Sequence, residues 1–339
     1  MKKTVYVRNV PIGDGKIKIQ SMTNTPTWDV EATLAQIIRL AAAGADLVRV
    51  SVPDQKSAEV IDKLVVNSPV PLIGDIHYGE KTALTAIEKG IAKIRINPGN
   101  MSDTAVSAVV KKCIEYNVPI RVGVNKGSCN ARTAKELAFA CMDSAKKIED
   151  LGWDKLVLAV KTSDVNETVE AYEILSGMTD HPLHIGLTEA GVGEPAKIRS
   201  AVAVGSLLIK GIGDTVRISL AGDPVEEVIF AKKILQSVGL NKNYVHVVAC
   251  PTCSRTCIPV EKIAISLQKK ADNIKKPLKI AVMGCVVNGI GEGKDADFGI
   301  AGGPNESILF EHGKQIKIVP NEEIEDVLLA MTERYCHDE

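Results

Sequence analysis

Three cysteines in the last third of the chain carry the strongest chemical signal. Cys250 and Cys253 stand two residues apart in Cys-Pro-Thr-Cys, and Cys285 follows in a segment that we predict to be a glycine-rich loop ending at Glu292. Two cysteines at this spacing can hold one metal centre from a single turn. Three thiolates and one carboxylate oxygen suit an iron–sulfur cluster in which one iron differs from the others.

Zinc and a different fourth ligand are the alternatives for this centre. Closed structural zinc sites take four Cys or His ligands, often as two paired motifs. The chain has no second Cys-x-x-Cys and no paired histidines, which disfavours zinc. Cys257 lies close to Cys253, and by chemistry alone a fourth thiolate ranks above Glu292 as a ligand. The remaining cysteines are predicted to be ordinary free thiols: Cys113, Cys129, Cys141 and Cys336.

A second group of polar residues lies where predicted strands end. Residues two apart on a strand share a face, so several of these side chains are expected to point the same way. The group consists of Arg49, Asp75, His77, Arg95, Asn97, Arg121, Asn125, Lys161, Glu189, Arg217 and Ser219. The alternative is that some of them lie on outer faces and pair with carboxylates of helices.

Charge balance within this group predicts an anionic ligand. If the side chains point inward, two carboxylates, Asp75 and Glu189, face five permanent cations. An unpaired buried cation costs several kcal/mol. Arginine donates two parallel hydrogen bonds to phosphate. We therefore expect a polyanionic small molecule, with a diphosphate as its recognised part.

Composition limits the class of protein. The chain has 339 residues, 45% of them apolar and 4% aromatic, and a net charge of −1. This charge does not indicate a nucleic-acid surface, and no apolar stretch is long enough to span a bilayer. Eight irregularly spaced cysteines without a secretory signal at the N-terminus predict a reduced, cytoplasmic protein rather than a disulfide framework.

The predicted secondary structure around these residues consists of repeated strand–helix units. Eight strands are predicted, at residues 17–21, 47–52, 72–76, 92–97, 119–124, 155–160, 183–187 and 215–220. Asp29, Ser102 or Asp103, Ser163-Asp164, and Asp223 are predicted to cap the helices between them. Eight such units predict an α/β fold, a (β/α)8 TIM barrel over residues 1–240. A doubly wound open sheet is the alternative.

A smaller α/β domain is predicted for residues 241–339, after a linker at 236–244. Its strands are expected at 245–249, 278–282, 298–301 and 316–319, and its helices at 259–271 and 322–334. Because the cysteine motifs fall in this part, we predict that it binds the iron–sulfur cluster and that the barrel binds the substrate.

At these residues the chain closely resembles the 4-hydroxy-3-methylbut-2-enyl diphosphate synthase family of the non-mevalonate isoprenoid pathway. The likeness runs in order along nearly the whole chain. The motifs that carry it begin at Gln20 (Gln-Ser-Met-Thr-Asn-Thr), Val48 (Val-Arg-Val-Ser), Gly74 (Gly-Asp-Ile-His-Tyr), Arg95 (Arg-Ile-Asn-Pro-Gly-Asn), Arg121 (Arg-Val-Gly-Val-Asn), Val160 (Val-Lys), Thr188 (Thr-Glu-Ala-Gly), Arg217 (Arg-Ile-Ser), Cys250 (Cys-Pro-Thr-Cys) and Gly284 (Gly-Cys-Val-Val-Asn-Gly).

The resemblance implies an oxidoreductase that opens and dehydrates 2-C-methyl-D-erythritol 2,4-cyclodiphosphate. It implies a 4Fe–4S cluster on Cys250, Cys253, Cys285 and Glu292, with two electrons delivered by flavodoxin or ferredoxin. It further implies a homodimer in which one cluster domain caps the partner's barrel. Glu189 is then the preferred proton donor and Asp75 the second choice, with Glu292 as a further catalytic residue. The residues expected to bind substrate are Arg49, His77, Arg95, Asn97, Arg121, Asn125, Lys161, Arg217, Ser219 and Asn288.

Two other functions compete with this one. A metal-independent barrel aldolase or pterin-type transferase with a zinc-stabilised appendage needs a nucleophile at the barrel mouth, and Lys161 is the one plausible Schiff-base lysine. A zinc-ribbon protein that binds nucleic acid is disfavoured by the near-neutral charge and the few aromatic residues.

Overall fold

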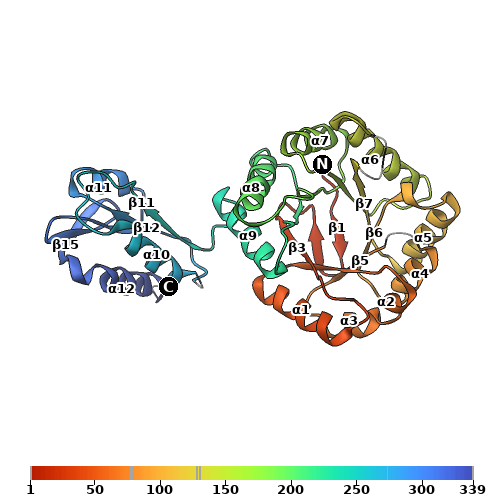
Figure 1. The fold of residues 1–339 in the computed structure, drawn as a ribbon, viewed down its shortest axis with the longest axis horizontal. Coiled ribbons are helices and arrows are strands. Elements are labelled where there is room, and N and C mark those ends of the chain that lie inside the picture. The colour runs from red at the N-terminus through yellow and green to blue at the C-terminus, as the bar shows by residue number, and fades with distance from the viewer. Residues whose placement is uncertain (1, 77–78, 127–128, 130, 273, 338–339) are drawn as a thin grey trace. The chain divides into compact units, whose positions relative to one another are not determined.

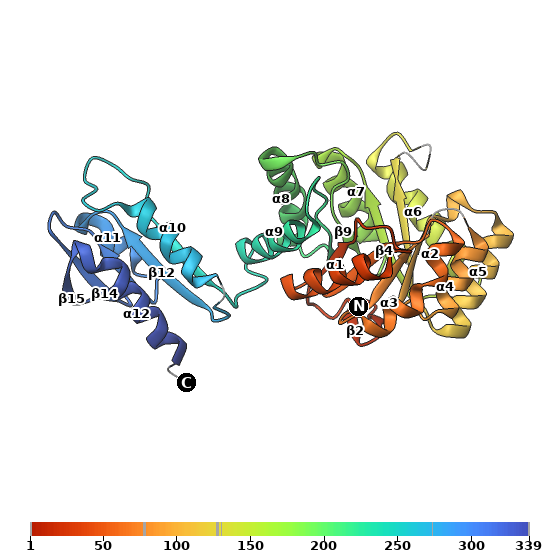
Figure 2. The same cartoon turned by 60° about the horizontal axis from the view of Figure 1, so that its bottom comes forward.

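The chain forms two compact units that divide between Leu240 and Asn241, shown in Figures 1 and 2. The structure, a computed structural model, describes residues 2–76, 79–126, 129, 131–272 and 274–337. Of residues 100, 288 and 337 it describes the backbone. Within these residues no helix is long and apolar enough to cross a membrane.

Eight parallel strands of the first unit form a ring (Figure 1). Strand β10 pairs with both β3 and β9, and a bridge between Leu158 and Leu183 joins β8 to β9. This closure confirms the (β/α)8 barrel, and the alternative of an open doubly wound sheet is wrong. The strands are β3 (Lys18–Met22), β4 (Leu47–Ser51), β5 (Leu72–Asp75), β6 (Lys93–Ile96), β7 (Ile120–Asn125), β8 (Leu156–Lys161), β9 (His184–Ile185) and β10 (Thr215–Val216).

A helical layer surrounds this ring, and four of its helices begin at caps that the sequence predicts. Asp29 accepts a hydrogen bond from the N–H of Ala32, and Ser102 rather than Asp103 caps its helix. Asp164 and Asp223 cap as predicted. The helices are α1 (Val30–Ala43), α2 (Gln55–Glu59), α3 (Ile61–Asn67), α4 (Glu80–Glu88), α5 (Asp103–Tyr116), α6 (Ala134–Glu149), α7 (Val165–Met178), α8 (Gly193–Ile209) and α9 (Pro224–Ser237), with a 3₁₀ turn at Pro98–Asn100.

An N-terminal hairpin closes one end of the barrel. Its strands β1 (Val5–Val7) and β2 (Val10–Ile12) pair antiparallel. Val7 and Ile12 are fully buried and pack with residues near the N-terminal ends of the barrel strands, among them Leu47 and Ile73. This hairpin was not predicted, because strands of three residues carry too little alternation to be recognised. Because apolar side chains fill this end of the barrel, the polar site residues lie at the opposite end.

The second unit is a five-stranded sheet with helices on both faces. Alternate residues of β12 face in opposite directions: Ile280 belongs to the cluster with α10 and α12, and Ala281 to the cluster with Ile290 of α11. Strand β14 was not predicted. The elements are β11 (Val245–Ala249), α10 (Val260–Ala271), β12 (Leu278–Met283), α11 (Val286–Gly293), β13 (Phe298–Ala301), β14 (Glu306–Glu311), β15 (Lys314–Pro320), a 3₁₀ turn (Asn321–Glu323) and α12 (Ile324–His337).

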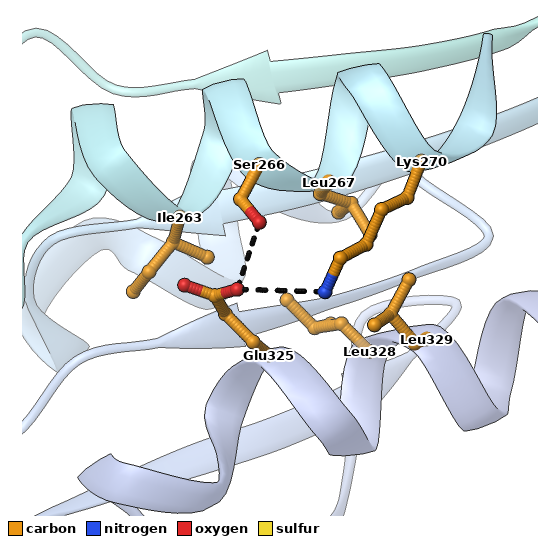
Figure 3. Close-up of a pocket in the computed structure, with 7 residues that line it drawn as sticks. All are labelled: Ile263, Ser266, Leu267, Lys270, Glu325, Leu328 and Leu329. Carbon is orange, nitrogen blue, oxygen red and sulfur yellow. Dashed lines mark hydrogen bonds and ion pairs between the residues drawn. The ribbon is translucent and has the colours of Figure 1, made fainter.

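Helices α10 and α12 pack along the seam shown in Figure 3. Leu267 and Leu328 are buried in it. Beside them Glu325 accepts a hydrogen bond of 2.8 Å from Ser266 and lies 3.8 Å from Nζ of Lys270. The hollow along this seam is lined by four apolar residues and by these three polar residues, which bond to one another, so it serves packing rather than binding.

Helix α11 corrects the prediction of a glycine-rich loop after Cys285. Cys285 is the N-cap residue, and the segment up to Gly293 is helical. A Cβ on Gly289 would lie 2.8 Å from Cβ of Ala301, and one on Gly293 would lie 2.5 Å from the ring of Phe310. The glycines therefore allow a helix to approach the sheet closely, although glycine is a poor helix former.

Candidate active site

Eight of the predicted site residues line one pocket in the first unit. They are Arg49, Asp75, Arg95, Arg121, Asn125, Lys161, Arg217 and Ser219. Most lie at or just beyond the C-terminal ends of barrel strands, where enzymes of this fold place their sites. Gly123, Val124, Ala159 and Thr188 complete the described lining.

Asp75 lies between two arginines of this pocket. Its Oδ2 atom is 3.7 Å from Nε of Arg49, and its Oδ1 atom is 3.4 Å from Nη1 of Arg95. Asp75 is only 3% exposed. Burial lowers the pKa of Arg49 to about 10, while the Asp75 carboxylate opposes that shift. Asp75 therefore orients two cations and neutralises part of their charge.

Several arginine donors in the pocket have no hydrogen-bond partner in the described structure. Nε and Nη1 of Arg121 are buried without one, and so are Nε of Arg95 and Nε of Arg217. Burial, followed by the charges of Arg49 and Arg95, holds the pKa of Arg121 well below its ordinary value. Unpaired buried donors are rare in native proteins and point to a missing ligand. The pocket is suited to an anion with several oxygens.

Lys161 extends this cationic lining from the end of β8. Its Nζ atom lies 3.2 Å from Nε2 of His184. Burial and then the charges of Arg121, Arg217, Arg49 and Arg95 hold the pKa of Lys161 well below its ordinary value. An anion in the pocket would reverse this effect, because it favours the ammonium form.

In the second unit the cysteine motifs lie on adjoining loops. Cys250 follows β11, and its Sγ atom accepts a hydrogen bond of 3.0 Å from the N–H of Gly284, next to Cys285. The N–H of Cys257 donates to the carbonyl oxygen of Gly284 at 2.8 Å. Cys250 and Cys285 are partly exposed, and Cys253 is exposed. These contacts bring the Cys-Pro-Thr-Cys turn beside the start of α11.

The donor types fit an iron–sulfur cluster, although the side chains do not form a closed site. Cysteine thiols and an N–H donor to sulfur are what such clusters use. Glu292 is exposed on α11, and the side chain of Asn288 lies outside the described part of the chain. Within the described residues no three His, Cys, Asp or Glu side chains are grouped closely enough to hold a metal ion.

Comparison with known sequences decides the family. The family model described as GcpE TIM-barrel domain matches residues 2–232, and that described as GcpE protein C-terminal domain matches residues 246–334. The chain belongs to the GcpE family.

Curated relatives of this GcpE chain carry the name 4-hydroxy-3-methylbut-2-en-1-yl diphosphate synthase (flavodoxin). One from Caldanaerobacter subterraneus subsp. tengcongensis is 46% identical and covers 100% of both chains. Another from Clostridium perfringens is 44% identical over 98% of both chains. One from Thermotoga maritima is 46% identical over 93% of this chain and 92% of its own. The predicted resemblance is confirmed.

Solved structures similar to the GcpE barrel show its fold alone. A dihydropteroate synthase from Xanthomonas albilineans has a TM-score of 0.52 at 16% identity and covers 70% of this chain and 99% of its own. A type I 3-dehydroquinate dehydratase from Clostridium difficile has a TM-score of 0.53 at 16% identity, over 71% of this chain and 98% of its own. At these identities the likeness assigns no activity.

Three residues predicted to act in the GcpE barrel fall outside the described pocket lining. Glu189 is exposed, with a left-handed φ of +54°, and adjoins the lining residue Thr188. Asn97 is buried and accepts a hydrogen bond of 3.2 Å from the N–H of Gly99. His77 lies outside the described residues. Their proposed roles remain predictions.

Three buried residues that the sequence analysis missed complete the site. Glu227 of α9 lies 3.7 Å from Arg217. His184 is fully buried behind Lys161. Lys93 of β6 is fully buried, and its Nζ atom has no hydrogen-bond partner in the described structure. Of these three residues, only Lys93 could have been predicted from the sequence. It stands two residues before Arg95 and thus on the same face of the strand.

Proposed function

We propose that this chain is a 4-hydroxy-3-methylbut-2-en-1-yl diphosphate synthase. It converts 2-C-methyl-D-erythritol 2,4-cyclodiphosphate to the allylic diphosphate by reductive ring opening and loss of water. Relatives with this name match it over their whole length. The observation that carries the proposal is the set of unpaired arginine donors in the barrel pocket, since a cyclic diphosphate supplies the oxygens that they lack.

The substrate is bound by the barrel and oriented by its phosphates. We assign phosphate binding to Arg49, Arg95, Arg121, Lys161 and Arg217, and additional hydrogen bonds to His77, Asn97, Asn125, Ser219 and Asn288. Arginine suits this role because its planar fork meets two phosphate oxygens at once. The walls of the pocket exclude much of the water, which strengthens each charge interaction. The reacting carbon atoms are thereby held in one orientation.

The second unit holds a 4Fe–4S cluster in this proposal. Cys250, Cys253 and Cys285 provide thiolates, and Glu292 provides the fourth ligand. When bound, the cluster supplies the two electrons of the reaction. The N–H of Gly284 donates to the sulfur of Cys250, a contact of the kind that the sulfur atoms of such clusters accept. Cys257, which is tied to Gly284 through its backbone, is the alternative fourth ligand.

Acid catalysis is assigned to Glu189 first and to Asp75 second. Glu189 is exposed beside the pocket and free to donate a proton to a leaving oxygen. Asp75 lies within ion-pair distance of two arginines, which makes it a better orienting group than acid. Glu292 is proposed to act in the reaction besides holding the cluster.

Flavodoxin is the proposed electron donor, since the names of the relatives specify it. We further propose that the protein works in the cytoplasm, where cysteines stay reduced, and as a homodimer in which each second unit serves the partner's barrel.

Anaerobic reconstitution tests this function. Protein purified without oxygen is expected to contain iron and sulfide, and to consume the cyclic diphosphate when reduced flavodoxin is supplied. Mass spectrometry of the product should show the allylic diphosphate. Stoichiometric zinc without iron would contradict the proposal. Activity that survives complete removal of iron would favour a metal-independent barrel transferase instead.

A further inference from the structure

His184 forms a hydrogen-bonded link between the pocket and the barrel wall. Its Nε2 atom lies 3.2 Å from Nζ of Lys161, and its Nδ1 atom lies 2.7 Å from Oγ1 of Thr215. The backbone carbonyl of His184 accepts a hydrogen bond of 2.5 Å from the hydroxyl of Tyr172. Both ring nitrogens and the backbone are therefore engaged, which leaves the ring of this fully buried residue a single orientation.

The surroundings of His184 keep its ring neutral. Burial is the main cause, and the charges of Lys161, Arg121, Lys93 and Arg49 add to it, so that the pKa of His184 lies well below its ordinary value. A neutral imidazole has one acceptor nitrogen and one N–H donor. An ammonium group has donors only. If Lys161 is charged, Nε2 of His184 must accept, and Nδ1 must then donate to Thr215.

We propose that His184 is a positioning residue for Lys161, and that its Nε2 atom accepts from the Lys161 ammonium group when the pocket holds a diphosphate. This inference deepens the proposed function and rests on its anion site. A carboxylate in the same place would orient Lys161 but cancel its charge. A neutral imidazole orients the ammonium group and leaves its charge available to phosphate.

The ring tautomer gives a direct test that does not depend on catalysis. Protein labelled with ¹⁵N-histidine is saturated with inorganic pyrophosphate at neutral pH, and the ring ¹⁵N shifts of His184 are assigned with the His184→Gln variant. A protonated Nδ1 and an unprotonated Nε2 are expected. A protonated Nε2, or a doubly protonated ring, in the pyrophosphate complex would overturn the inference.

Matched variants test the consequence for binding. His184→Phe keeps a ring but removes the acceptor, and should weaken pyrophosphate binding about tenfold, the usual size for a lost hydrogen bond to a charged group. His184→Gln offers an acceptor again and should restore most of that loss. His181→Phe is the control, because His181 is also buried but is bonded to Glu149 instead of a pocket residue.

A second variant tests the inference if His184→Phe does not fold. Thr215→Val removes the partner of Nδ1 with little change in volume, and should weaken pyrophosphate binding about threefold. Unchanged binding in Thr215→Val, together with a protonated Nε2, would contradict the positioning role alone. If the unchanged protein does not bind pyrophosphate, both the anion site of the proposed function and this inference are wrong.

Discussion

Glu227 of α9 and Arg217, just beyond β10, are joined by a buried ion pair at the edge of the pocket. The Oε2 atom of Glu227 lies 3.7 Å from Nη2 of Arg217, and its Oε1 atom accepts a hydrogen bond of 2.9 Å from the N–H of Leu220. One carboxylate thus fixes both a pocket cation and the loop after its strand. Glu227 is 5% exposed, and burial raises its pKa.

Glu227→Gln should tighten the binding of inorganic pyrophosphate. The amide oxygen can still accept from Leu220, while the negative charge that competes for Arg217 is lost. We expect an increase in affinity of about two- to tenfold, measured by calorimetry. Glu226→Gln is the control, because this neighbouring carboxylate lies on the outer side and pairs with Lys197. Weaker binding in Glu227→Gln would mean that the ion pair is needed to orient Arg217.

Arg121→Met should abolish most pyrophosphate binding without affecting the cluster. Two of its guanidinium nitrogens are buried without partners, so they are free to bind an anion. Loss of a bidentate charged contact is expected to weaken binding about a hundredfold. Arg39→Met, which removes an exposed arginine paired with Asp223, serves as the control. Equal iron content in both variants, measured after anaerobic purification, is part of the expected result.

Gly186→Ala should disrupt the pocket through a single methyl group. A Cβ at this position would lie 2.3 Å from the carbonyl oxygen of Arg217 and 2.8 Å from Nζ of Lys161. We expect a loss of about 1–3 kcal/mol in the free energy of unfolding and at least tenfold weaker pyrophosphate binding. Gly177→Ala, in α7 with no atom within 4 Å, should be neutral or stabilising. Normal pyrophosphate binding by Gly186→Ala would show that the backbone near residue 186 shifts to make room for the methyl group.

Lys93→Met should stabilise the protein at neutral pH. Burial first, and then the charges of Arg121 and Arg49, hold the pKa of Lys93 well below its ordinary value. The unfolded chain therefore binds this proton more readily, and stability falls as pH falls from about 10.4 toward the depressed pKa. Methionine removes that loss, with an expected gain of about 1–3 kcal/mol at pH 7.

Urea unfolding across the alkaline range checks this prediction for Lys93. The difference between the variant and the unchanged protein should grow as the pH is lowered from 10 to 7. Lys89→Met changes a lysine that is 38% exposed on its side chain and pairs with Asp62, and should shift stability by less than about 0.5 kcal/mol. A less stable Lys93→Met variant at every pH would indicate that Lys93 has a partner essential to the fold.

Cys285→Ser and Cys257→Ser should separate the ligands of the cluster. Cys285 caps α11 beside the Cys250 loop, so its loss is expected to remove iron and sulfide from anaerobically purified protein. Cys257→Ser should retain both, because Glu292 provides the fourth ligand in our proposal. Iron loss in Cys257→Ser, with iron retained in Glu292→Gln, would assign Cys257 as the ligand instead.

The predicted ends of strands β3 to β8 lie within one residue of those in the structure, because their signals are local. The segments predicted as strands at 183–187 and 215–220 are strands only at His184–Ile185 and Thr215–Val216. Arg95 of β6 and Arg121 of β7 are paired across the two strands. Their positions along each strand are set by the alternation of side chains. Helix starts at Asp29 and Asp164 were predicted for the same reason, since a cap needs only the next few residues. The hairpin of β1 and β2, with three residues in each strand, was missed because so few residues do not define a period.

Local patterns were enough to predict the barrel and the cationic character of its mouth, because strand alternation and helix caps depend on neighbouring residues and the arginines follow the strands directly. Which groups meet those cations follows from the packing of the elements. Glu227 of α9, the helix that follows β10, points inward and pairs with Arg217, whereas Glu189 is exposed. The segment after Cys285 became helical because its glycines allow close packing on Ala301 and Phe310. Such contacts join different elements and depend on how those elements pack, which no local pattern encodes.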